Sequence, residues 1–352
     1  MFFLNTIIRG SRLPPKTLSL TFDDGPGTTA SASGPGPRTD ELGHFLFAKG
    51  IPATFFVIGN RAARHRELLS RLVQWGHLVA NHGHDHTAVD ALPGRRVVDD
   101  VLRCAAAIGD ASNPESLLFR PPLGAWSPEA ARTLNLDPET RRYIGPIGWD
   151  IDGRDWEAWH QQQTVEHCAD RYFEAIRAKG SGIVLLHDNT TERNNTYEMT
   201  RLLVPRLVKD GYRFVRLDGV PQVRSAMRVK ASVALADPSS GLYASARNGG
   251  GGPIFFVAKA IDAWEEFGIV PLDHGDVALR TSSGQFVCVC NDGDGGTLAN
   301  GEQPDESGRF TISPVTGSVV TLTSARGNRL SISGNLLTAA GAAKQFTLLQ
   351  RA

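Results

Sequence analysis

The chain has 352 residues, long enough for two domains, and its 37 Lys and Arg balance its 37 Asp and Glu to give a formal net charge of zero. A dedicated nucleic-acid-binding protein carries a basic surplus, so this balance argues against that class. No stretch reaches the roughly 18 consecutive apolar residues that a membrane span requires. We therefore expect a globular protein with neither a nucleic-acid partner nor a membrane span.

Apolar runs alternate with helical patterns through the first two hundred residues. The apolar runs predict strands at Leu18–Phe22, Ala53–Ile58, His77–Asn81, Leu117–Arg120, Tyr143–Asp150, Gly182–His187 and Tyr212–Val215. Helical spacing between them predicts helices at Thr39–Lys49, His65–Trp75, Arg95–Ile108, Pro128–Leu136, Thr164–Lys179 and Tyr197–Lys209. Such alternation predicts a parallel sheet with crossover helices, that is, an α/β fold.

The pattern changes after about Ser225, where Gly and Ser become frequent and short strands dominate. A motif repeats three times in this region, beginning at Val233–Ala236, Val277–Arg280 and Val320–Thr323. Each repeat closes on an aromatic residue, which is Phe267, Phe310 or Phe346. Three units of about forty residues, each with four short strands, predict an all-β trefoil, because no unit can bury its apolar face alone. We therefore expect two domains, 1–224 and 225–352.

The N-terminus and the cysteines indicate in which cellular compartment the protein is expected. Met1–Ile8 is apolar but lacks the basic start and the cleavage site of a signal peptide, so we expect a short lead-in strand or turn. Cys104, Cys168, Cys288 and Cys290 show no disulfide framework, since a bridge between two cysteines one residue apart in a strand would be strained. Reduced thiols without a signal peptide favour the cytoplasm. If a leader had been removed, the protein would be secreted.

Two adjacent carboxylates stand at the end of the first predicted strand, in Thr21-Phe22-Asp23-Asp24-Gly25-Pro26. Successive side chains of a strand point to opposite faces, so at its end one can face a metal and the other a reacting water. Gly25 and Pro26 then turn the chain. Taken alone, Asp-Asp-Gly-Pro is more often a surface turn, so its meaning depends on matching residues downstream.

A histidine cluster, Asn81-His82-Gly83-His84-Asp85-His86, follows the third predicted strand. His82 and His86 are four residues apart, so one helical turn or a tight loop brings both imidazoles to one point. Two imidazoles and a carboxylate are a common binding set for a divalent metal. The pair alone also fits a polar surface loop, but the upstream acid pair favours a metal site. We expect His84, which lies between the two, to point away from the metal.

These motifs resemble those of the polysaccharide deacetylase family, carbohydrate esterase family 4. The first family motif is matched at Thr21–Pro26, and the second, His-Ser/Thr-x-x-His, at His82–His86. Gly83 replaces the hydroxyl residue that steadies this loop, a role that Asp85 could partly take. Three further motifs follow in family order at Arg120–Gly124, Asp152–Trp156 and Leu185–His187. The resemblance implies a distorted (β/α) barrel of seven or eight strands.

The resemblance also implies the role of each site residue. The ligands of one divalent metal ion would be Asp24, His82 and His86. Zinc is the expected metal, with cobalt, manganese and nickel as alternatives. Asp23 would be the general base, paired with Arg120, which keeps it ionised. His187 would be the general acid that protonates the leaving amine, and Asp155 would orient it.

Four apolar side chains complete the predicted site. We expect Trp156 and Trp126 to form walls for a sugar ring, with ordinary packing as the alternative, and Leu123 and Leu185 to line the cleft. The favoured function is a metal-dependent hydrolase that removes N-acetyl groups from a chitooligosaccharide, a peptidoglycan-like glycan or a small glycoside. An O-acetyl esterase or another amide deacylase would use the same site.

A protein without catalysis that only binds carbohydrate is a third hypothesis, which retention of all the motif residues disfavours. The C-terminal region resembles the fascin-like branch of the trefoils, and next to a sugar-modifying enzyme it suggests a carbohydrate-binding appendage. A structural or docking domain is the alternative. Asn291–Gly296 is expected to form a hairpin turn rather than a calcium site, because it lacks the regular continuation and final Glu of such a loop.

Overall fold

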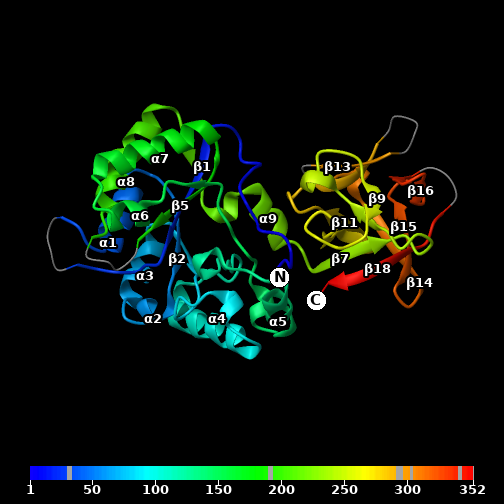
Figure 1. Cartoon of the computed structure of the whole chain (residues 1–352), viewed down its shortest axis with the longest axis horizontal. Coiled ribbons are helices and arrows are strands. Elements are labelled where there is room, and N and C mark those ends of the chain that lie inside the picture. Colours follow the sequence, from blue (N-terminus) through cyan, green and yellow to red (C-terminus); the bar gives the residue numbers. More distant parts are fainter. Residues whose placement is uncertain (30–33, 189–192, 291–295, 302–303, 340–342, 352) are drawn as a thin grey trace. The chain divides into compact units, whose positions relative to one another are not determined.

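The computed structural model describes residues 1–351 apart from 30–33, 189–192, 291–295, 302–303 and 340–342. The chain divides into two compact units (Figure 1). One contains Phe2 and Ile8–Arg224, and the other contains Met1, Phe3–Ile7 and Ser225–Ala352. The short segment Phe3–Ile7 thus groups with the C-terminal strands, whereas the sequence placed it with the barrel. The turn expected at Asn291–Gly296 lies almost wholly outside the described residues.

A parallel sheet forms the centre of the first unit. Its strands are β1 (Thr17–Asp23), β2 (Thr54–Val57), β3 (Leu78–Asn81), β4 (Ile151–Asp152), β5 (Gly182–His187) and β6 (Arg213–Phe214). They lie in the order β3-β2-β1-β5-β4, and β6 pairs with the beginning of β1. All residues of β1 are buried because this strand has neighbours on both sides. Its sequence alternates the apolar Leu18, Leu20 and Phe22 with polar residues that are buried as well.

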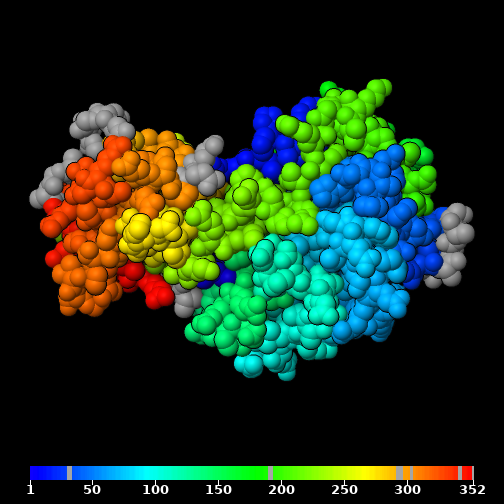
Figure 2. All heavy atoms as spheres, turned by 180° about the vertical axis from the view of Figure 1, so that it is seen from behind, coloured from blue at the N-terminus to red at the C-terminus, as the bar shows by residue number. Residues whose placement is uncertain are grey.

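Helices connect these strands and cover the sheet (Figure 1). They are α1 (Thr39–Ala48), α2 (Gly59–Ala62), α3 (Arg66–Gln74), α4 (Arg95–Ile108), α5 (Pro128–Leu136), α6 (Asp155–His160), α7 (Val165–Lys179), α8 (Thr196–Lys209) and α9 (Pro221–Met227). In α4, Val97, Val101, Cys104 and Ile108 recur at helical spacing and are all buried. The opposite side of α4, cyan in Figure 2, forms part of the outer surface of this unit.

Two segments predicted as strands, 117–120 and 143–150, form only isolated bridges. Phe119 pairs with Asn81 of β3, and Leu118 pairs with Ile144, both in parallel. Pro121, Pro122 and Pro146 have no N–H to donate and Gly145 weakens a strand, so continuous ladders do not form here. Within the part of this unit that the structure describes, the sheet therefore has six strands, where the sequence predicted seven or eight, and it is a distorted barrel.

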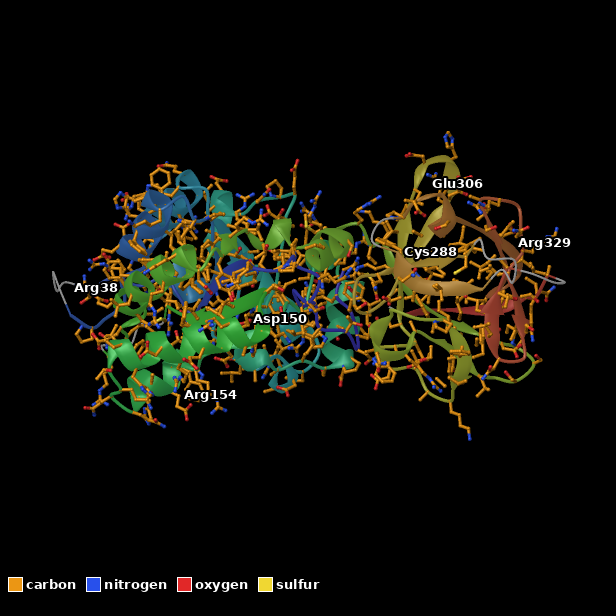
Figure 3. The ribbon with its side chains drawn as sticks, turned by 90° about the horizontal axis from the view of Figure 1, so that it is seen from above. Arg38, Asp150, Arg154, Cys288, Glu306 and Arg329 are labelled. Atoms are coloured by element: carbon orange, nitrogen blue, oxygen red, sulfur yellow. The ribbon has the colours of Figure 1, made fainter. Side chains whose placement is uncertain are left out.

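Asp150 ties the irregular segment to β5 and so helps to close the barrel. Its backbone N–H donates to the carbonyl of Ile183 at 2.9 Å. Its Oδ2 accepts from the backbone N–H of Ile183 at 2.9 Å and of Gly10 at 2.6 Å. Figure 3 shows Asp150 inside this unit, whereas Arg154, four residues later, lies at its periphery. The chain from 144 to 152 thus connects the β3 edge with the β5 edge.

The second unit is built from short antiparallel strands. They are β7 (Ala231–Ala236), β8 (Tyr243–Ser245), β9 (Phe255–Ala258), β10 (Phe267–Pro271), β11 (Val277–Arg280), β12 (Phe286–Val289), β13 (Thr297–Gly301), β14 (Phe310–Thr316), β15 (Val319–Ser324), β16 (Ser331–Ser333), β17 (Leu336–Thr338) and β18 (Phe346–Arg351). Strands β7, β10, β11, β14, β15 and β18 pair in a closed ring, which is a six-stranded barrel. The pairs β8–β9, β12–β13 and β16–β17 form outside that ring.

The core of this unit combines side chains from all three sequence repeats. Phe267, Phe310 and Phe346, which close the repeats, belong to one buried cluster. Phe3–Ile7 joins the unit through hydrogen bonds. The carboxylate of Glu266, buried at 2% exposure, accepts from the backbone N–H groups of Leu4 at 3.2 Å and Asn5 at 3.1 Å. These two bonds compensate the buried charge and attach the N-terminal segment.

Two expectations from composition concern the whole chain. Among the described residues, Cys104, Cys168, Cys288 and Cys290 form no disulfide with one another. Among the described residues, none of the helices combines the length and the apolar character needed to cross a bilayer.

Candidate active site

A cavity of about 410 Å³ opens where the strands of the first unit end. β1 ends at Asp23, β4 at Asp152 and β5 at His187, and in parallel strands these carboxyl ends meet at one edge. The cavity is lined by Asp23, Asp24, His82, His86, Leu123, Gly124, Trp149, Asp152, Trp156, Leu185 and His187. Residues from all five predicted motifs are therefore either in this lining or, as shown below, bonded to it.

Asp24, His82 and His86 converge in this cavity. Nε2 of His86 lies 2.9 Å from Oδ1 of Asp24, and Nε2 of His82 lies 3.4 Å from the same oxygen. Among the described residues, these three form a group whose ligand atoms all lie within 4.8 Å of one another. His84 is outside this group, as expected, and its Nε2 lies 3.8 Å from the Asp85 carboxylate.

The chemistry of these three side chains fits a divalent cation. Oδ1 of Asp24 is buried and accepts no hydrogen bond in the described structure. Nδ1 of His82 lies 2.8 Å from the carbonyl of Arg120, which selects the tautomer with the proton on Nδ1 and leaves the Nε2 lone pair free. Burial alone would raise the pKa of Asp24, but His82 and His86 outweigh it and hold the pKa well below its usual range. A carboxylate with two imidazoles suits zinc and similar metals.

Two of these ligands have unusual backbone conformations. Asp24 has φ of 72° and His86 has φ of 56°, in the left-handed region that residues other than glycine rarely adopt. The backbone carbonyl of Asp24 accepts a hydrogen bond from the Arg61 guanidinium. The carbonyl of the next residue, Gly25, accepts one from the N–H of Ile58. Such strain persists where surrounding contacts determine the conformation, and it is concentrated at functional sites.

Asp23 lies beside the group formed by Asp24, His82 and His86, and it pairs with Arg120. The distance from Nη1 of Arg120 to Oδ1 of Asp23 is 2.7 Å, and both side chains are buried, at 0% and 5% exposure. Arg120 also donates to Oγ1 of Thr21 at 2.8 Å and to the carbonyls of Ile147 and Gly148. Oδ2 of Asp23 lies 3.7 Å from Nε2 of His82. The guanidinium therefore fixes one oxygen of Asp23 while the other faces the group of ligands.

His187 and Asp155 form a second buried pair. Nδ1 of His187 lies 2.7 Å from Oδ1 of Asp155, whose Oδ2 accepts from the His187 backbone N–H at 2.7 Å. Thr196 donates to the same Oδ2 at 3.1 Å. Burial alone would lower the pKa of His187, but Asp155, with further help from Asp23 and Asp24, raises it to about 9. The imidazole is thus oriented with Nε2 toward the cavity, and its raised pKa favours the doubly protonated, charged ring at neutral pH.

The structure places three of the four predicted apolar side chains at the cavity. Trp156, Leu123 and Leu185 line the cavity, and the first two are well exposed, at 49% and 72%. Trp126 is not among the residues that line this cavity, and its role as a wall stays a prediction. Its ring packs against Phe2, with centroids 5.6 Å apart, and against Phe119 at 6.3 Å. These contacts favour the ordinary-packing alternative for this residue.

Three lining residues were absent from the predicted site: Trp149, Asp152 and Gly124. Trp149 lies near the end of a segment that the sequence predicted as a strand. This position at a strand end was the signal by which the sequence could have identified it as a cavity residue. Asp152 is the first residue of the Asp-x-x-Asp-Trp motif, and burial raises its pKa. Gly124 packs against Trp149, because an added Cβ at Gly124 would lie 2.9 Å from the indole ring.

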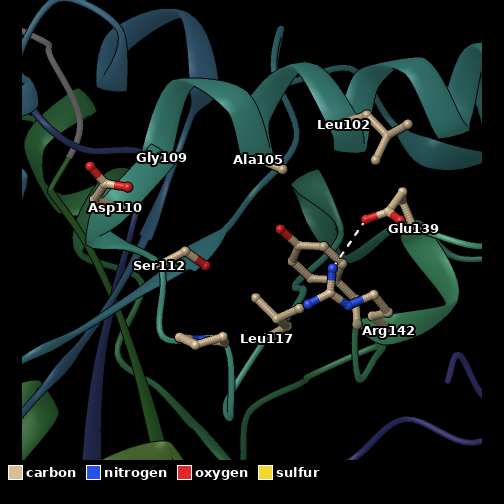
Figure 4. Close-up of a pocket in the computed structure, with 10 residues that line it drawn as sticks. Leu102, Ala105, Gly109, Asp110, Ser112, Leu117, Glu139 and Arg142 are labelled. Atoms are coloured by element: carbon tan, nitrogen blue, oxygen red, sulfur yellow. Dashed lines mark hydrogen bonds and ion pairs between the residues drawn. The ribbon is translucent and has the colours of Figure 1, made fainter.

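A second cavity, of about 440 Å³, lies on the outer side of α4 (Figure 4). Glu139 and Arg142, 3.1 Å apart, lie on one side of it, and Asp110 and Ser112 lie on the other. It contains none of the residues that the motifs predicted, so its size does not make it the centre of the chemistry.

Comparisons with known proteins point to one family. The model of the family described as Polysaccharide deacetylase matches residues 10–137 of this chain. A chitooligosaccharide deacetylase of a Bradyrhizobium strain is 31% identical over 210 residues, covering 56% of this chain and 87% of the relative. A peptidoglycan-N-acetylglucosamine deacetylase of Bacillus cereus is 30% identical over 200 residues, covering 57% and 85%.

The chain belongs to the polysaccharide deacetylase family. It is therefore a hydrolase of the class that acts on carbon–nitrogen bonds other than peptide bonds. A crystal structure of a peptidoglycan N-acetylglucosamine deacetylase superposes with a TM-score of 0.50 at 18% identity, covering 62% of this chain and 92% of that protein. At this identity the superposition supports the deacetylase fold of the N-terminal unit and nothing finer.

Proposed function

We propose that this deacetylase removes N-acetyl groups from an acetylated amino sugar in a glycan, with a divalent cation held by Asp24, His82 and His86. The convergence of the buried Oδ1 of Asp24 with the Nε2 atoms of His86, at 2.9 Å, and His82, at 3.4 Å, carries this proposal. When bound, such a cation polarises the acetamide carbonyl and makes water more acidic. Zinc is the metal we expect, with cobalt, manganese and nickel as alternatives.

The chain's own side chains account for the proton transfers of hydrolysis. Asp23 accepts a proton from the attacking water at the carboxylate oxygen that Arg120 leaves free. The water oxygen bonds to the carbonyl carbon, the carbon–nitrogen bond breaks, and His187 donates its proton to the leaving amine. The products are acetate and the free amino sugar. Asp155 supports this role because it orients His187 and favours its protonated form.

The lining of the cavity agrees with a sugar as substrate. Trp156 and Trp149 offer apolar faces, while Asp152 offers a hydrogen-bonding group beside them. The two relatives compared above are named for deacetylation of chitooligosaccharides and of peptidoglycan N-acetylglucosamine, which supports an N-acetylated glycan here.

Two variants test the proposal. Asp24→Ala is expected to lose bound metal and activity, because it removes a ligand. Asp23→Asn is expected to retain metal and lose turnover, because it removes only the base. Metal content by elemental analysis and acetate release from acetylated chitooligosaccharides and from acetyl esters are the measurements. Asp99→Asn, at an exposed carboxylate on α4, serves as the control.

Each outcome of this test is informative. Release of acetate from esters but not from N-acetylated sugars would favour an O-acetyl esterase. If both Asp24→Ala and Asp23→Asn hydrolyse acetylated chitooligosaccharides as well as the parent protein, the proposed mechanism is wrong.

We further propose that residues 225–352 form a β-trefoil of the fascin-like kind, as a domain distinct from a catalytic domain at 1–224. The closed ring of six strands, the three outer strand pairs and the three four-strand repeats support this assignment. Its role as a glycan-binding appendage stays a prediction, as does the cytoplasmic location. The glycan-binding role can be tested with the Asp23→Asn chain, which is expected to be catalytically inactive. Its binding to chitin is compared with that of the same chain carrying Trp264→Ala. Trp264 is 45% exposed, so its loss should weaken binding if the domain holds glycan.

A further inference from the structure

The loop between the two histidine ligands is held by buried hydrogen bonds from its backbone. The N–H of Gly83 donates to Oδ1 of Asn81 at 2.9 Å. The next two N–H groups both donate to one carboxylate: His84 to Oδ2 of Asp100 at 3.0 Å, and Asp85 to Oδ1 at 3.2 Å. Asp100 comes from α4 and is only 7% exposed. One carboxylate therefore fixes the segment that separates His82 from His86.

Gly83 is required by this arrangement. Its φ is 73°, which favours glycine, and a Cβ added there would lie 2.6 Å from Oδ2 of Asp100 and 3.2 Å from Cγ of Pro122. A serine or threonine at this position would thus collide with the carboxylate that holds the loop. The sequence suggested that the loop lacks support because its hydroxyl residue is missing. The structure instead contains a support that leaves no room for that residue.

Asp85 does not supply this support, although the sequence suggested that it could. Its side chain lies 2.7 Å from Nη1 of Arg103 and 3.4 Å from Nδ2 of Asn60, on the exposed side of the loop. That pair is accessible to solvent, so its contribution to stability is expected to be small. Asp85 participates in the support only through its backbone N–H.

We propose that Asp100, with Gly83 as its obligatory neighbour, is the positioning residue that sets the spacing of His82 and His86 for metal. This proposal rests on the proposed function, because it assumes that the two histidines hold a cation. A carboxylate is suited to the task since both its oxygens only accept, and here each one receives an N–H. An asparagine keeps one acceptor but turns an NH2 group toward an N–H donor. The loop would then lose one bond and gain a repulsion between donors.

The test uses the full-length chain, freed of metal, and the variants Asp100→Asn and Gly83→Ser. Asp99→Asn is the matched control, since Asp99 precedes Asp100 on α4 but is 57% exposed. Affinity for Zn²⁺ and Co²⁺ is measured by competition with a chromophoric chelator. We expect binding about 10–100-fold weaker in both test variants, the range typical when a residue that orients metal ligands is lost. The control should bind metal as the parent does.

A second readout needs no metal. Hydrogen exchange of the His84 and Asp85 amides in the metal-free protein should accelerate in Asp100→Asn, because their acceptor is impaired. Amides of β5 should keep their protection, which shows that the variant is folded. The double variant Gly83→Ser/Asp100→Ala should lose less affinity than the losses of the single variants Gly83→Ser and Asp100→Ala added together, because removal of the carboxylate makes room for the serine.

Parent-like metal affinity in Asp100→Asn, or unchanged exchange at His84 and Asp85, would overturn the assignment of Asp100. Parent-like affinity in Gly83→Ser would overturn the claim that glycine is required. These failures differ from failure of the proposed function. If the parent protein binds metal yet releases no acetate from any acetylated glycan, the function is wrong while the role of Asp100 stands.

Discussion

Replacement of Arg120 by methionine tests whether the pair with Asp23 is essential to the fold as well as to the chemistry. Arg120 is fully buried, and its guanidinium lies 4.2 Å from the centre of the Phe56 ring. Methionine can keep much of the apolar contact of the arginine stem but carries no charge and no donor. Asp23, with a side chain only 5% exposed, would lose its counter-charge. The variant also removes the hydrogen bonds from Arg120 to Thr21, Ile147 and Gly148, so the contribution of the pair itself is obtained from a double-mutant cycle.

The distance between the two groups sets the scale of the effect. At an effective dielectric constant near 20, unit charges 2.7 Å apart attract by about 6 kcal/mol. Part of this attraction only compensates the cost of removing both charges from water, so the net loss is smaller. Removal of one partner from a buried pair typically costs about 3–5 kcal/mol. We expect the free energy of unfolding of the barrel to fall by about 4 kcal/mol.

Urea denaturation followed by tryptophan fluorescence measures this loss. Five of the six tryptophans lie in the unit Ile8–Arg224, so the signal reports mainly on the barrel. The variants are Arg120→Met, Asp23→Asn and the double variant. Neutralising Asp23 should recover much of the loss in the Arg120→Met background, because no unpaired charge then remains. The coupling free energy of the cycle should exceed about 2 kcal/mol.

Arg142→Met is the matched control, since Arg142 lies 3.1 Å from Glu139 but both side chains are exposed. An exposed pair contributes about 0–1 kcal/mol, so this variant should be nearly as stable as the parent. If Arg120→Met were no more destabilising than Arg142→Met, the argument from burial would be refuted. It would be refuted equally if Asp23→Asn restored nothing.

Three further outcomes are expected. Asp155→Asn should lower the pKa of His187, which Asp155 raises to about 9; because His187 must be protonated to act as the acid, the alkaline limb of kcat for acetate release should move to lower pH. Burial raises the pKa of Asp188 in the folded protein to about 8. Its bound proton therefore stabilises the fold fully below the pKa of the unfolded chain, near 4, and this stabilisation is lost as pH rises through about 8. Asp188→Asn should therefore flatten the fall of Tm over that interval, and an unchanged slope would contradict this. Trp156→Ala should raise KM for glycan about 2–10-fold with little change in kcat, whereas a loss confined to kcat would argue against a wall role.

Much of the site could be predicted because its residues follow strands directly. Asp23 ends β1 and His187 ends β5, and parallel pairing brings these two residues into register. Apolar runs mark such strands in the sequence, and parallel topology requires their carboxyl ends to share one edge. For His82 and His86, the spacing of four residues allowed a shared point, and the upstream acid pair made a metal site the favoured prediction. Each of these inferences depends on sequence patterns alone.

Other features could not be predicted because they depend on packing between distant segments. Trp126 follows a motif at short range, yet its ring packs against Phe2, far away in the sequence. Trp149 lines the cavity because the irregular segment 144–152 spans the barrel edge, and a local pattern predicted only a strand there. Six strands form rather than seven or eight because proline and glycine interrupt the hydrogen-bond ladders, an effect that apolar content does not reveal.

The sequence by itself determined which chemical groups this protein can bring to a reaction. The acid pair, the spaced histidines and the order of the motifs are properties of the chain, and they limit the candidate site to the chemistry of carboxylates and imidazoles. Only the tertiary structure decided how these groups are held. Arg120 reaches Asp23 across 97 residues, and Asp100 holds the histidine loop from the next helix. Such partners are selected by burial, since a buried N–H or charge must find an acceptor or counter-charge wherever the fold places one.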